Sequence, residues 1–563
     1  MLYFLILPMG KTHARGRNRP SPVAKAEGHW RSRFGIAFSD PTVHAHWWRS
    51  PLLSCLMGGI LMGLTPEPVN AWPLAWIALV PLWRSVMALP ALPATGTVFR
   101  LGFLWSGVYH GIALSWITAL HPLTWMGIPW LASLAIALFA WAFITGLGSV
   151  TFGLWAVLLR KLSDRCQLNA ASRILVGTAL WCLLETLLSW GPLYWPSLSY
   201  TQSPHNLWIL HLGQLAGPMT VTGAIVAING CWAEMSLRRT TATTTRSKSL
   251  ALVGLLLIAG LHGVGGMLYN QPLPTSPQAA LKIGLIQGNI PTRIKLTPEG
   301  TRQAVERYTQ SYRDLVEQGA DAVLTPEGAI PEVWSRIYQA QNPLRKAVLE
   351  KGVVLWLGTF RPAIHNQMRY LTQSLVNLDA QGEVTSQYNK VKLVPLGEYI
   401  PFQAILGRLI SRLSPVDSSL LPGDTQQVFE TPLGRAVVGI CYESAYSELF
   451  RRQTAQGGQW IMTASNNDPY PPLMMRQHHA QDVMRAVEND RWSVRVTNTG
   501  ISGVVTPHGK TLWLGPANQY VTHLTTIYRQ QSQTLYARWG NWLTYLLLLG
   551  AIAASLISLR YHS

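Results

Sequence analysis

Four long stretches without a single charged residue constrain the fold of this chain more than any other feature. They cover residues 101–159, 186–233, 249–281 and 539–559. About 20 consecutive apolar residues are enough for an α-helix to cross the hydrocarbon core of a bilayer. Only 13% of the 563 residues are charged, whereas soluble proteins carry about 25%. We therefore expect neither a disordered chain, nor a coiled coil, nor a purely soluble enzyme.

The apolar segments predict a polytopic α-helical membrane domain with about eight transmembrane helices. We expect these helices near 52–66, 71–89, 101–120, 128–159, 172–190, 205–233, 249–269 and 541–559. The first two are short, so buried core helices are the alternative for them. The fourth is longer than about 30 Å of hydrocarbon requires, which indicates either a break at Gly146 and Gly148 or an extension beyond the lipid. Glu185 lies in the fifth, and the sequence leaves open whether it is functional or an internally hydrogen-bonded structural residue.

The distribution of Lys and Arg predicts the orientation in the membrane. The net charge of +19 suits either nucleic acid or an anionic membrane surface as a partner. Basic residues gather before the first predicted span, between the fourth and fifth, and between the sixth and seventh, whereas the loops near 67–70, 121–127 and 191–204 contain none. Because loops rich in Lys and Arg stay in the cytoplasm, we expect region 270–538 to lie outside it. A membrane is thus expected as a partner, and nucleic acid is not.

Composition divides the chain into four parts. Residues 1–50 are basic and rich in Pro and Ser, which predicts a disordered cytoplasmic tail. Residues 51–270 are expected to form a membrane domain with seven transmembrane helices, and 271–530 a folded exported domain. Residues 531–563 complete the chain with a C-terminal transmembrane helix and a short cytoplasmic end.

The exported part alternates strand and helix patterns, which predicts an α/β domain. We expect strands at 281–287, 322–324, 353–359, 374–379, 383–388, 436–440, 460–463, 492–497 and 503–506, the last two closing the set. Helices are expected at 298–318, 338–351, 444–453 and 476–489. The first of these helices is amphipathic, with Tyr308, Tyr312 and Leu315 on its apolar face.

Reactive side chains follow three of the predicted strands. Glu327 follows Pro326 at a strand end, Lys390 and Glu398 belong to a second segment, and Cys441 follows an apolar strand and precedes a helix. The last arrangement resembles a nucleophile elbow, in which helix-terminal N–H groups lower the pKa of an exposed thiol. Glu327 can then serve as base and Lys390 as the cation that stabilises a tetrahedral intermediate, while Glu398 can either orient Lys390 or shuttle protons. Taken singly, each also fits a plain surface charge or, for Cys441, a small buried hydrophobe.

The cysteines and histidines predict neither a disulfide in the exported part nor a metal site. Of the five Cys, only Cys441 lies in the exported region, so it is expected to be a free thiol. His478 and His479 form an isolated pair that is best explained as a polar helix surface. We expect no metal and no cofactor.

These segments together resemble the Glu-Lys-Cys pattern of the nitrilase (carbon–nitrogen hydrolase) superfamily. With seven predicted spans before the domain and one after it, the chain resembles the apolipoprotein N-acyltransferase family in particular. The matching motifs are Phe103-Leu-Trp105, Ser115-Trp116, Trp195-Pro196, Ser199-Tyr-Thr-Gln202, Gln287-Gly-Asn-Ile-Pro291, Tyr388-Asn-Lys390, Gly397-Glu398 and Cys441-Tyr-Glu443. The resemblance covers about residues 50–560.

The resemblance implies an αββα sandwich that carries Cys441 as nucleophile, Glu327 as general base and Lys390 as the transition-state cation. It gives Glu398 an essential supporting role. Tyr442, Glu443 and Tyr388 take substrate-binding or supporting roles. The family moves an acyl chain from a membrane phospholipid, through a Cys thioester, to the α-amino group of the diacylglyceryl-cysteine of an apolipoprotein. The implied location is the bacterial inner membrane, with the catalytic domain on the periplasmic side.

Two alternatives remain beside acyl transfer, and two segments depart from the family pattern. A membrane-tethered amidase or nitrilase would use the same triad to hydrolyse a C–N bond, and a scaffold without activity would use none of it.

The family commonly has Trp where Leu296 stands, and Ala-Trp-Phe-Gly where the segment from Pro469 begins. We expect both places to touch lipid or to act as mobile arms. The apolar run Leu473 to Met475 either dips into the bilayer or packs inside the domain.

Overall fold

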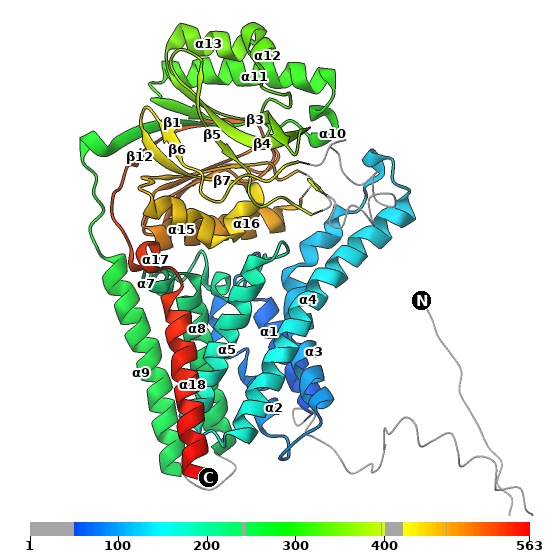
Figure 1. Cartoon of the computed structure of the whole chain (residues 1–563), viewed down its shortest axis with the longest axis vertical. Helices are drawn as coiled ribbons and strands as arrows, with labels where there is room; N and C mark the ends of the chain where they lie inside the picture. Colours follow the sequence, from blue (N-terminus) through cyan, green and yellow to red (C-terminus); the bar gives the residue numbers. More distant parts are fainter. Residues whose placement is uncertain (1–49, 239–243, 396, 400–419, 469, 563) are drawn as a thin grey trace, which may run out of the picture. The chain divides into compact units, whose positions relative to one another are not determined.

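The computed structural model describes residues 50–238, 244–395, 397–399, 420–468 and 470–562. All of them belong to one compact unit, Trp48–Ser563. The predicted tail 1–50 lies outside the described residues except for Ser50, and so do Arg239 of the sixth-to-seventh loop and Pro469. In the described unit a helical part is followed by two β-sheets (Figure 1).

Within the described residues, the helical part contains nine α-helices before the sheets and two after them. Their bounds are α1 (Pro51–Gly63), α2 (Val80–Met87), α3 (Thr95–Ala113), α4 (Trp130–Arg165), α5 (Ala170–Trp190), α6 (Leu207–Leu210), α7 (Gly213–Ala216), α8 (Pro218–Arg238), α9 (Thr244–Tyr269), α17 (Leu535–Trp539) and α18 (Trp542–His562). Among the described residues, four helices are long and apolar enough to cross a membrane, namely α4, α5, α9 and α18. The segments Leu207–Ala216 and Pro218–Leu237 pass the same test together but are bent by 118°. The count of eight spans therefore stays a prediction.

Several predicted spans differ from straight single helices, and proline and glycine explain where. The span predicted at 71–89 is a 3₁₀ turn, Trp72–Trp76, followed by α2, and Pro73 and Pro81 each stand in the first turn of one piece. The bend before α8 falls at Gly217, whose φ of 72° is unfavourable for other residues. By contrast, the 36 residues of α4 are continuous through Gly146, so α4 is about 54 Å long. An extension beyond the lipid is thus the better of the two hypotheses for this segment.

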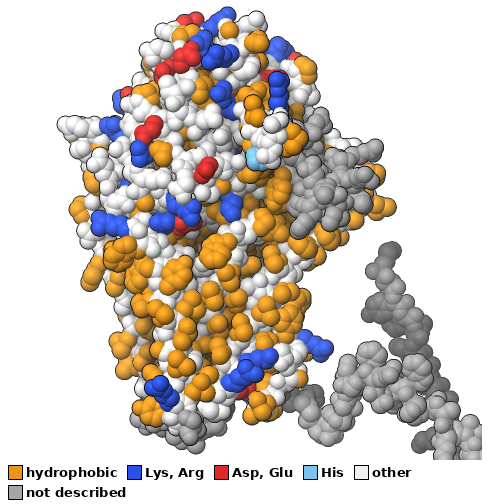
Figure 2. Space-filling view, in the orientation of Figure 1, with side chains coloured by type: hydrophobic (Ala, Val, Ile, Leu, Met, Phe, Trp, Pro, Cys, Tyr) orange, Lys and Arg blue, Asp and Glu red, His pale blue; other side chains and the backbone are white. Residues whose placement is uncertain are grey.

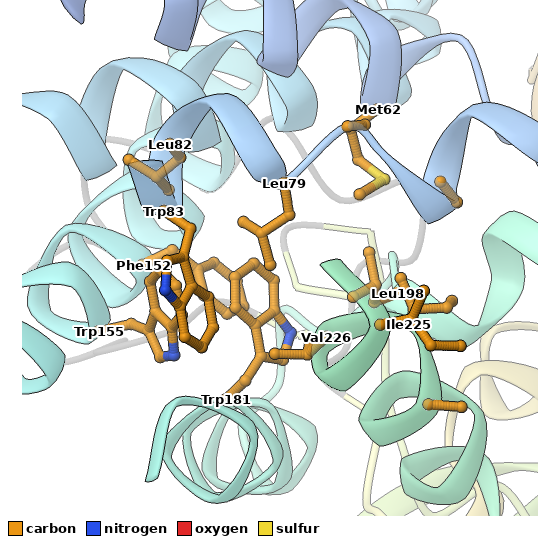
Figure 3. Packing of buried hydrophobic residues seen from close by; sticks show 14 of the residues in the cluster. Met62, Leu79, Leu82, Trp83, Phe152, Trp155, Trp181, Leu198, Ile225 and Val226 are labelled. Atoms are coloured by element: carbon orange, nitrogen blue, oxygen red, sulfur yellow. The ribbon is translucent and has the colours of Figure 1, made fainter. Parts of the chain in front are cut away.

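Aromatic side chains fill the centre of the helical part (Figure 3). The ring centroids of Phe152 and Trp181 lie 4.1 Å apart, and those of Trp83 and Trp155 lie 5.6 Å apart. All four side chains are buried. The outer surface of the same helices is also apolar (Figure 2): Met267 of α9 is 71% exposed and Leu549 of α18 is 65% exposed. A chain with apolar residues both inside and outside its helices is built for a lipid environment.

The described residues of the rest of the unit contain two six-stranded sheets. The strands are β1 (Ala280–Gln287), β2 (Ala322–Leu324), β3 (Val354–His365), β4 (Met368–Leu378), β5 (Val384–Asn389), β6 (Phe429–Thr431), β7 (Gly434–Ile440), β8 (Ile461–Ser465), β9 (Ser493–Thr497), β10 (Gly503–Val505), β11 (Thr511–Leu514) and β12 (Val521–Tyr528). One sheet has the order β12-β1-β2-β3-β4-β5 and the other β11-β10-β9-β8-β7-β6. One buried cluster contains Ile283 and Trp356 from the first sheet together with Val438 and Met462 from the second. The two sheets therefore share a core.

Helices lie on the outer face of each sheet. The helices α10 (Thr292–Lys295), α11 (Pro298–Glu317), α12 (Arg336–Gln341) and α13 (Pro343–Lys351) belong to the first layer, and α15 (Ser447–Ala455) and α16 (Pro472–Asn489) to the second. In Figure 1, α11 to α13 cover the sheet that faces away from the helical part, whereas α15 and α16 lie between the other sheet and the helical part. Tyr308, Tyr312 and Leu315 of α11 are buried, as its amphipathic pattern predicts.

All nine predicted strands are present, but the set was not complete. Strands β6, β11 and β12 were not predicted, and β12 pairs with β1 along its whole length, from Ala280 opposite Tyr528 to Gln287 opposite Val521. The residues of β11 alternate between intermediate and exposed positions, and most of β12 is half-buried. Both are edge strands of their sheets, so their apolar pattern is weak and easily missed.

The second sheet is docked on the helical part through α16. Gln477 of α16 accepts a hydrogen bond from Trp195 Nε1 at 2.9 Å and donates to the backbone oxygens of Glu67 and Ala113 at 3.0 and 2.9 Å. Val483 and Val487 of the same helix belong to the large buried cluster of the helical part. The loop after α5 and the start of α16 are thus fixed against each other.

Candidate active site

Three of the predicted reactive residues come together where β2, β5 and β7 end. Lys390 Nζ donates to Glu327 Oε1 at 2.8 Å and to Glu398 Oε1 at 2.5 Å. Lys390 is fully buried and Glu327 is 7% exposed. Glu398 Oε2 also accepts from the backbone N–H of Val394 at 2.9 Å, which fixes the turn that carries it. The sequence therefore identified two carboxylates and one ammonium that share a buried contact.

Cys441 faces the same group through the corner at Asn466. The thiol Sγ lies 3.8 Å from the backbone oxygen of Asn466, and the backbone N–H of Asn466 donates to Glu327 Oε2 at 2.9 Å. Cys441 begins the 3₁₀ helix η7 (Cys441–Ala445) with a φ of 53°, in the left-handed region. Such strain in a residue other than glycine is typical of a nucleophile at a sharp strand-to-helix turn.

The expected lowering of the Cys441 thiol pKa was wrong. The elbow predicted an exposed thiol with a lowered pKa, but Cys441 is only 5% exposed. Burial and, after it, the charge of Glu327 raise the pKa of the Cys441 thiol to about 12, although Lys390 opposes them. Burial also lowers the pKa of Lys390, but Glu327 and Glu398 outweigh it and raise that pKa well above its ordinary value. The resting site therefore holds a neutral thiol beside an ammonium and its carboxylates.

Glu443 connects the elbow to the segment after Lys390. Its Oε1 accepts from the backbone N–H groups of Val391 and Lys392 at 2.6 and 3.1 Å. Its Oε2 accepts from the backbone N–H of Ile440 at 2.7 Å and from the Tyr388 hydroxyl at 3.1 Å. Burial raises the pKa of Glu443 to about 7, although the backbone donors favour its ionised form. Glu443 and Tyr388 thus have contacts suited to a supporting role.

Tyr442 points away from the thiol and toward the helical part. Its hydroxyl lies 2.9 Å from the backbone oxygen of Pro192 and 3.0 Å from that of Tyr194. Its ring is parallel to that of Trp195, with centroids 6.1 Å apart. These contacts favour support of the elbow from the membrane side over contact with substrate.

Two further polar residues of the site were missed by sequence reasoning. Lys295 is 5% exposed, and its Nζ donates to the backbone oxygen of Glu327 at 2.9 Å. Burial lowers the pKa of Lys295 to about 8, against the pull of Glu327, Asp468 and Cys441. The second is Asn466, whose backbone joins Glu327 to the thiol. Lys295 lies four residues after the motif that ends at Pro291, and that proximity was the only available hint.

The interpretation of the histidine pair as a polar helix surface was wrong. His478 is fully buried and His479 is 6% exposed. His478 Nε2 lies 2.8 Å from the backbone oxygen of Cys441, whereas His479 Nε2 lies 2.9 Å from the Thr511 hydroxyl. The two side chains therefore have different partners, and only His478 contacts the elbow.

The segments that depart from the family pattern differ in exposure. Leu296 is 46% exposed, whereas Met474 and Met475 are buried, so the packing hypothesis holds for these two methionines. Tyr470 packs edge-on against Trp116 of the helical part, with ring centroids 5.6 Å apart. The loop after Asn467 thus contacts the helical part through its aromatic residue.

Contacts around Glu185 favour the structural hypothesis for this residue. Its carboxylate accepts from Ser197 Oγ at 2.5 Å, Trp181 Nε1 at 3.1 Å and the backbone N–H of Leu198 at 3.2 Å. Thr222 and Tyr194 hydroxyls lie 3.3 and 3.4 Å away. All five donors are neutral, and together they attach the loop after α5 to the helical core.

In the described part of the chain, no group of three or more His, Cys, Asp or Glu side chains is arranged to hold a metal ion. The side chains of the site also carry chemistry of their own. A carboxylate can accept a proton, a thiol can attack a carbonyl carbon, and an ammonium can stabilise the oxyanion that forms.

Comparison with known proteins gives two family matches that cover most of the chain. Residues 282–539 match the carbon–nitrogen hydrolase family, and residues 58–231 match the apolipoprotein N-acyltransferase N-terminal domain. Three similar proteins, from Nostoc sp., Thermosynechococcus vestitus and Synechocystis sp., are each named apolipoprotein N-acyltransferase. They are 52%, 46% and 42% identical to this chain, over 86%, 88% and 89% of it and 95%, 93% and 99% of their own lengths.

Proposed function

The chain belongs to the apolipoprotein N-acyltransferase family, and from that premise we propose that it N-acylates lipoproteins by a ping-pong reaction through a thioester at Cys441. The donor is a membrane phospholipid. The acceptor is the N-terminal α-amino group of S-diacylglyceryl-cysteine in an apolipoprotein. The observation that carries the proposal is the buried contact of Lys390 with both Glu327 and Glu398, next to the corner that holds the Cys441 thiol.

In the first half-reaction we assign the base to Glu327 and the nucleophile to Cys441. As sulfur attacks the ester carbonyl of the phospholipid, Glu327 takes the thiol proton, because burial keeps that thiol neutral at rest. Lys390 stabilises the negative oxygen of the tetrahedral intermediate. The C–O bond of the ester then breaks, and the departing lysophospholipid oxygen receives the proton from Glu327. The acyl chain remains on sulfur as a thioester.

In the second half-reaction the same groups act on the acceptor. The neutral α-amine attacks the thioester carbonyl and gives its proton to Glu327. Collapse of the intermediate forms the amide and expels the Cys441 sulfur, which recovers the proton. Cys441 and Glu327 are both almost inaccessible to solvent. Water therefore competes poorly with the amine for the thioester.

We propose a membrane setting that suits two lipid-anchored substrates. The chain is taken to cross the bacterial inner membrane about eight times, with residues 51–270 as the membrane domain and 531–563 as the last span and cytoplasmic end. Residues 271–530 are taken to be an αββα sandwich on the periplasmic side. In support, Figure 2 shows Lys and Arg side chains at the end of the helical part that is remote from the sheets. Near the C-terminal end of α4, Arg160 donates to the backbone oxygens of Val86 and Pro90. The positive-inside rule makes that end cytoplasmic.

The decisive experiment uses the full-length protein in proteoliposomes with acyl-labelled phospholipid and no acceptor. We expect a hydroxylamine-labile label on Cys441 that is discharged as amide when a diacylated lipopeptide is added. The variant Cys441→Ala should acquire no label, whereas Cys231→Ala, which changes a buried cysteine of α8, should label normally. Release of the label only as free fatty acid would point instead to a hydrolase, and a folded protein that forms neither adduct nor product would refute the proposal.

A further inference from the structure

The nucleophile occupies a strained backbone conformation that something must hold. Cys441 has a φ of 53°, and the left-handed conformation is unfavourable for a residue other than glycine because Cβ approaches the following carbonyl oxygen. On the N-terminal side, Glu443 accepts from the N–H of Ile440 at 2.7 Å. On the C-terminal side, the carbonyl oxygen of Cys441 lies 2.8 Å from His478 Nε2. The elbow is thus held at both ends, once by a predicted residue and once by a histidine with no assigned role.

The surroundings of His478 determine how its ring is used. A carbonyl oxygen can only accept, so Nε2 carries the proton and donates a hydrogen bond to the carbonyl oxygen of Cys441. The other ring nitrogen, Nδ1, is then free to accept from Asn467 Nδ2 at 3.2 Å. Asn467 directly follows Asn466, whose backbone binds both Glu327 Oε2 and the thiol. One buried imidazole therefore bridges the nucleophile and the corner that holds its base.

We propose that His478 is a positioning residue of the acyl-transfer site: its ring holds the Cys441 carbonyl against Asn467 and so sets where the sulfur stands relative to Glu327 and Lys390. The inference rests on the function proposed above and adds a residue to it. Helix α16, which carries His478, is itself anchored to the helical part through Gln477.

The chemistry of the ring argues against a role in proton transfer. Burial lowers the pKa of His478 to about 3, and the nearby guanidinium of Arg495 adds to that effect. Arg495 Nη2 donates to the backbone oxygen of His478 at 3.3 Å and pairs with Asp482, so a second positive charge next to it is unfavourable. The imidazole is therefore neutral throughout the working range of pH, and its contribution is geometric.

The adjacent histidine provides a matched control. His479 is also buried and also makes a hydrogen bond through Nε2, but its partner is Thr511 on β11. The same substitution at either position makes the same change in side-chain volume on the same helix. At His479 it affects one hydrogen bond, whereas at His478 it affects two, one of them to the Cys441 carbonyl oxygen. Only substitution of His478 releases the elbow, so the difference between the two variants isolates the positioning effect from a general loss of packing.

The test compares His478→Phe, His478→Gln, His479→Phe and His479→Gln in the full-length protein in proteoliposomes. We measure the rate at which Cys441 acquires label from acyl-labelled phospholipid, its dependence on donor concentration and pH, and the apparent Tm. Because a displacement of about 1 Å at a reacting centre costs roughly 100-fold in rate, His478→Phe should lower the saturating rate by about 100-fold with the KM for donor within about threefold. His478→Gln keeps a donor and an acceptor and should recover at least about tenfold, with a pH profile parallel to the wild type.

The results that would overturn the inference are equally specific. A folded His478→Phe within about threefold of the wild type, or an equal loss in His479→Phe, would refute it. Alkylation of Cys441 by iodoacetamide supplies a readout that needs no lipid. Its rate should differ about tenfold from that of the wild type in His478→Phe but not in His479→Phe. If the wild type acquires no label, the proposed function fails, while the alkylation rates of the two pairs of variants still decide the role of His478.

Discussion

Replacement of Glu443 by Gln tests how the elbow is held from its N-terminal side. The carboxylate accepts four hydrogen bonds in two pairs, from Val391 and Lys392 on one oxygen and from Ile440 and Tyr388 on the other. Gln has nearly the same shape, but it offers only one acceptor oxygen. Its amide nitrogen must therefore face one of the two pairs of donors.

The magnitude follows from the better of the two orientations. With the amide nitrogen placed toward Tyr388, the tyrosine hydroxyl can turn to accept, and only the N–H of Ile440 loses its acceptor. A buried donor without a partner costs about 1–3 kcal/mol, and replacement of a charged acceptor by a neutral one adds about 1 kcal/mol. We therefore expect Glu443→Gln to lower the free energy of unfolding by roughly 2–4 kcal/mol. Ile440 directly precedes Cys441, so the damage falls on the nucleophile, and the labelling rate should drop by about 100-fold.

Two variants calibrate this expectation. Tyr388→Phe removes one of the four donors to Glu443 and should cost about 1 kcal/mol. Glu448→Gln changes another carboxylate of the same region, which is 44% exposed and pairs with Arg451 and Arg452, and such exposed pairs contribute about 0–1 kcal/mol. We would measure the apparent Tm in detergent together with the rate of thioester formation at Cys441. If Glu443→Gln matched Glu448→Gln in both measurements, the reasoning about unsatisfied donors would be wrong.

Three further outcomes are expected. Because the pKa of Cys441 is raised to about 12, the rate of its alkylation by iodoacetamide should rise about tenfold per pH unit from pH 7 to 9, and a plateau of this rate below pH 8 would contradict the neutral thiol. Glu327→Gln removes a carboxylate that raises this pKa, so it should speed alkylation while abolishing acyl labelling. Lys390→Met leaves Glu327 and Glu398 without their shared cation and should destabilise the protein by about 3–5 kcal/mol, whereas Lys390→Met combined with Glu398→Gln should regain stability but not turnover. The pKa of Lys295 is lowered from 10.5 to about 8 in the folded protein, so the unfolded state binds more protons between these two pH values. The cost of burying the charge applies fully below pH 8 and disappears as pH rises toward 10.5. The apparent Tm of wild type relative to Lys295→Met should therefore increase over this interval, and parallel plots of Tm against pH would refute the lowered pKa.

Local pattern was sufficient to predict the elements that carry the reactive residues. The strand at 322–324 has the predicted bounds, and the apolar strand before Cys441 is present as β7. Glu327 follows β2 and Cys441 follows β7, as predicted, but these strands belong to different sheets. Local pattern therefore placed each residue at a strand end, whereas only the packing of the two sheets brings the strand ends together. A short buried strand that is followed by Pro or by a helix is determined mainly by its own sequence.

Features that depend on distant partners were not predictable in this way. His478 and His479 are polar residues on a helix, and nothing in a single sequence shows that one contacts a carbonyl 37 residues earlier. The bend at Gly217 accommodates the Tyr536 ring, which a Cβ at that position would approach to 2.4 Å. Tyr536 lies more than 300 residues further along the chain, so the reason for the bend is a contact that periodicity does not reveal.

The error about the thiol has a physical origin and a consequence for function. Sequence reasoning expected an exposed thiol whose pKa is lowered by helix-terminal N–H groups, but Cys441 is buried. Burial is the main cause of its raised pKa, and Glu327 and Glu398 add to it against the opposing effect of Lys390. A thiolate, rather than a thiol, is the species that oxidants and adventitious electrophiles attack. In the oxidising compartment proposed for this domain, a lone cysteine that stays protonated until an ester carbonyl is in place is protected from both. Burial, with the two carboxylates around Lys390 adding to it, thus keeps the Cys441 thiol protonated at rest, and in the proposed mechanism Glu327 removes the proton only when the reaction begins.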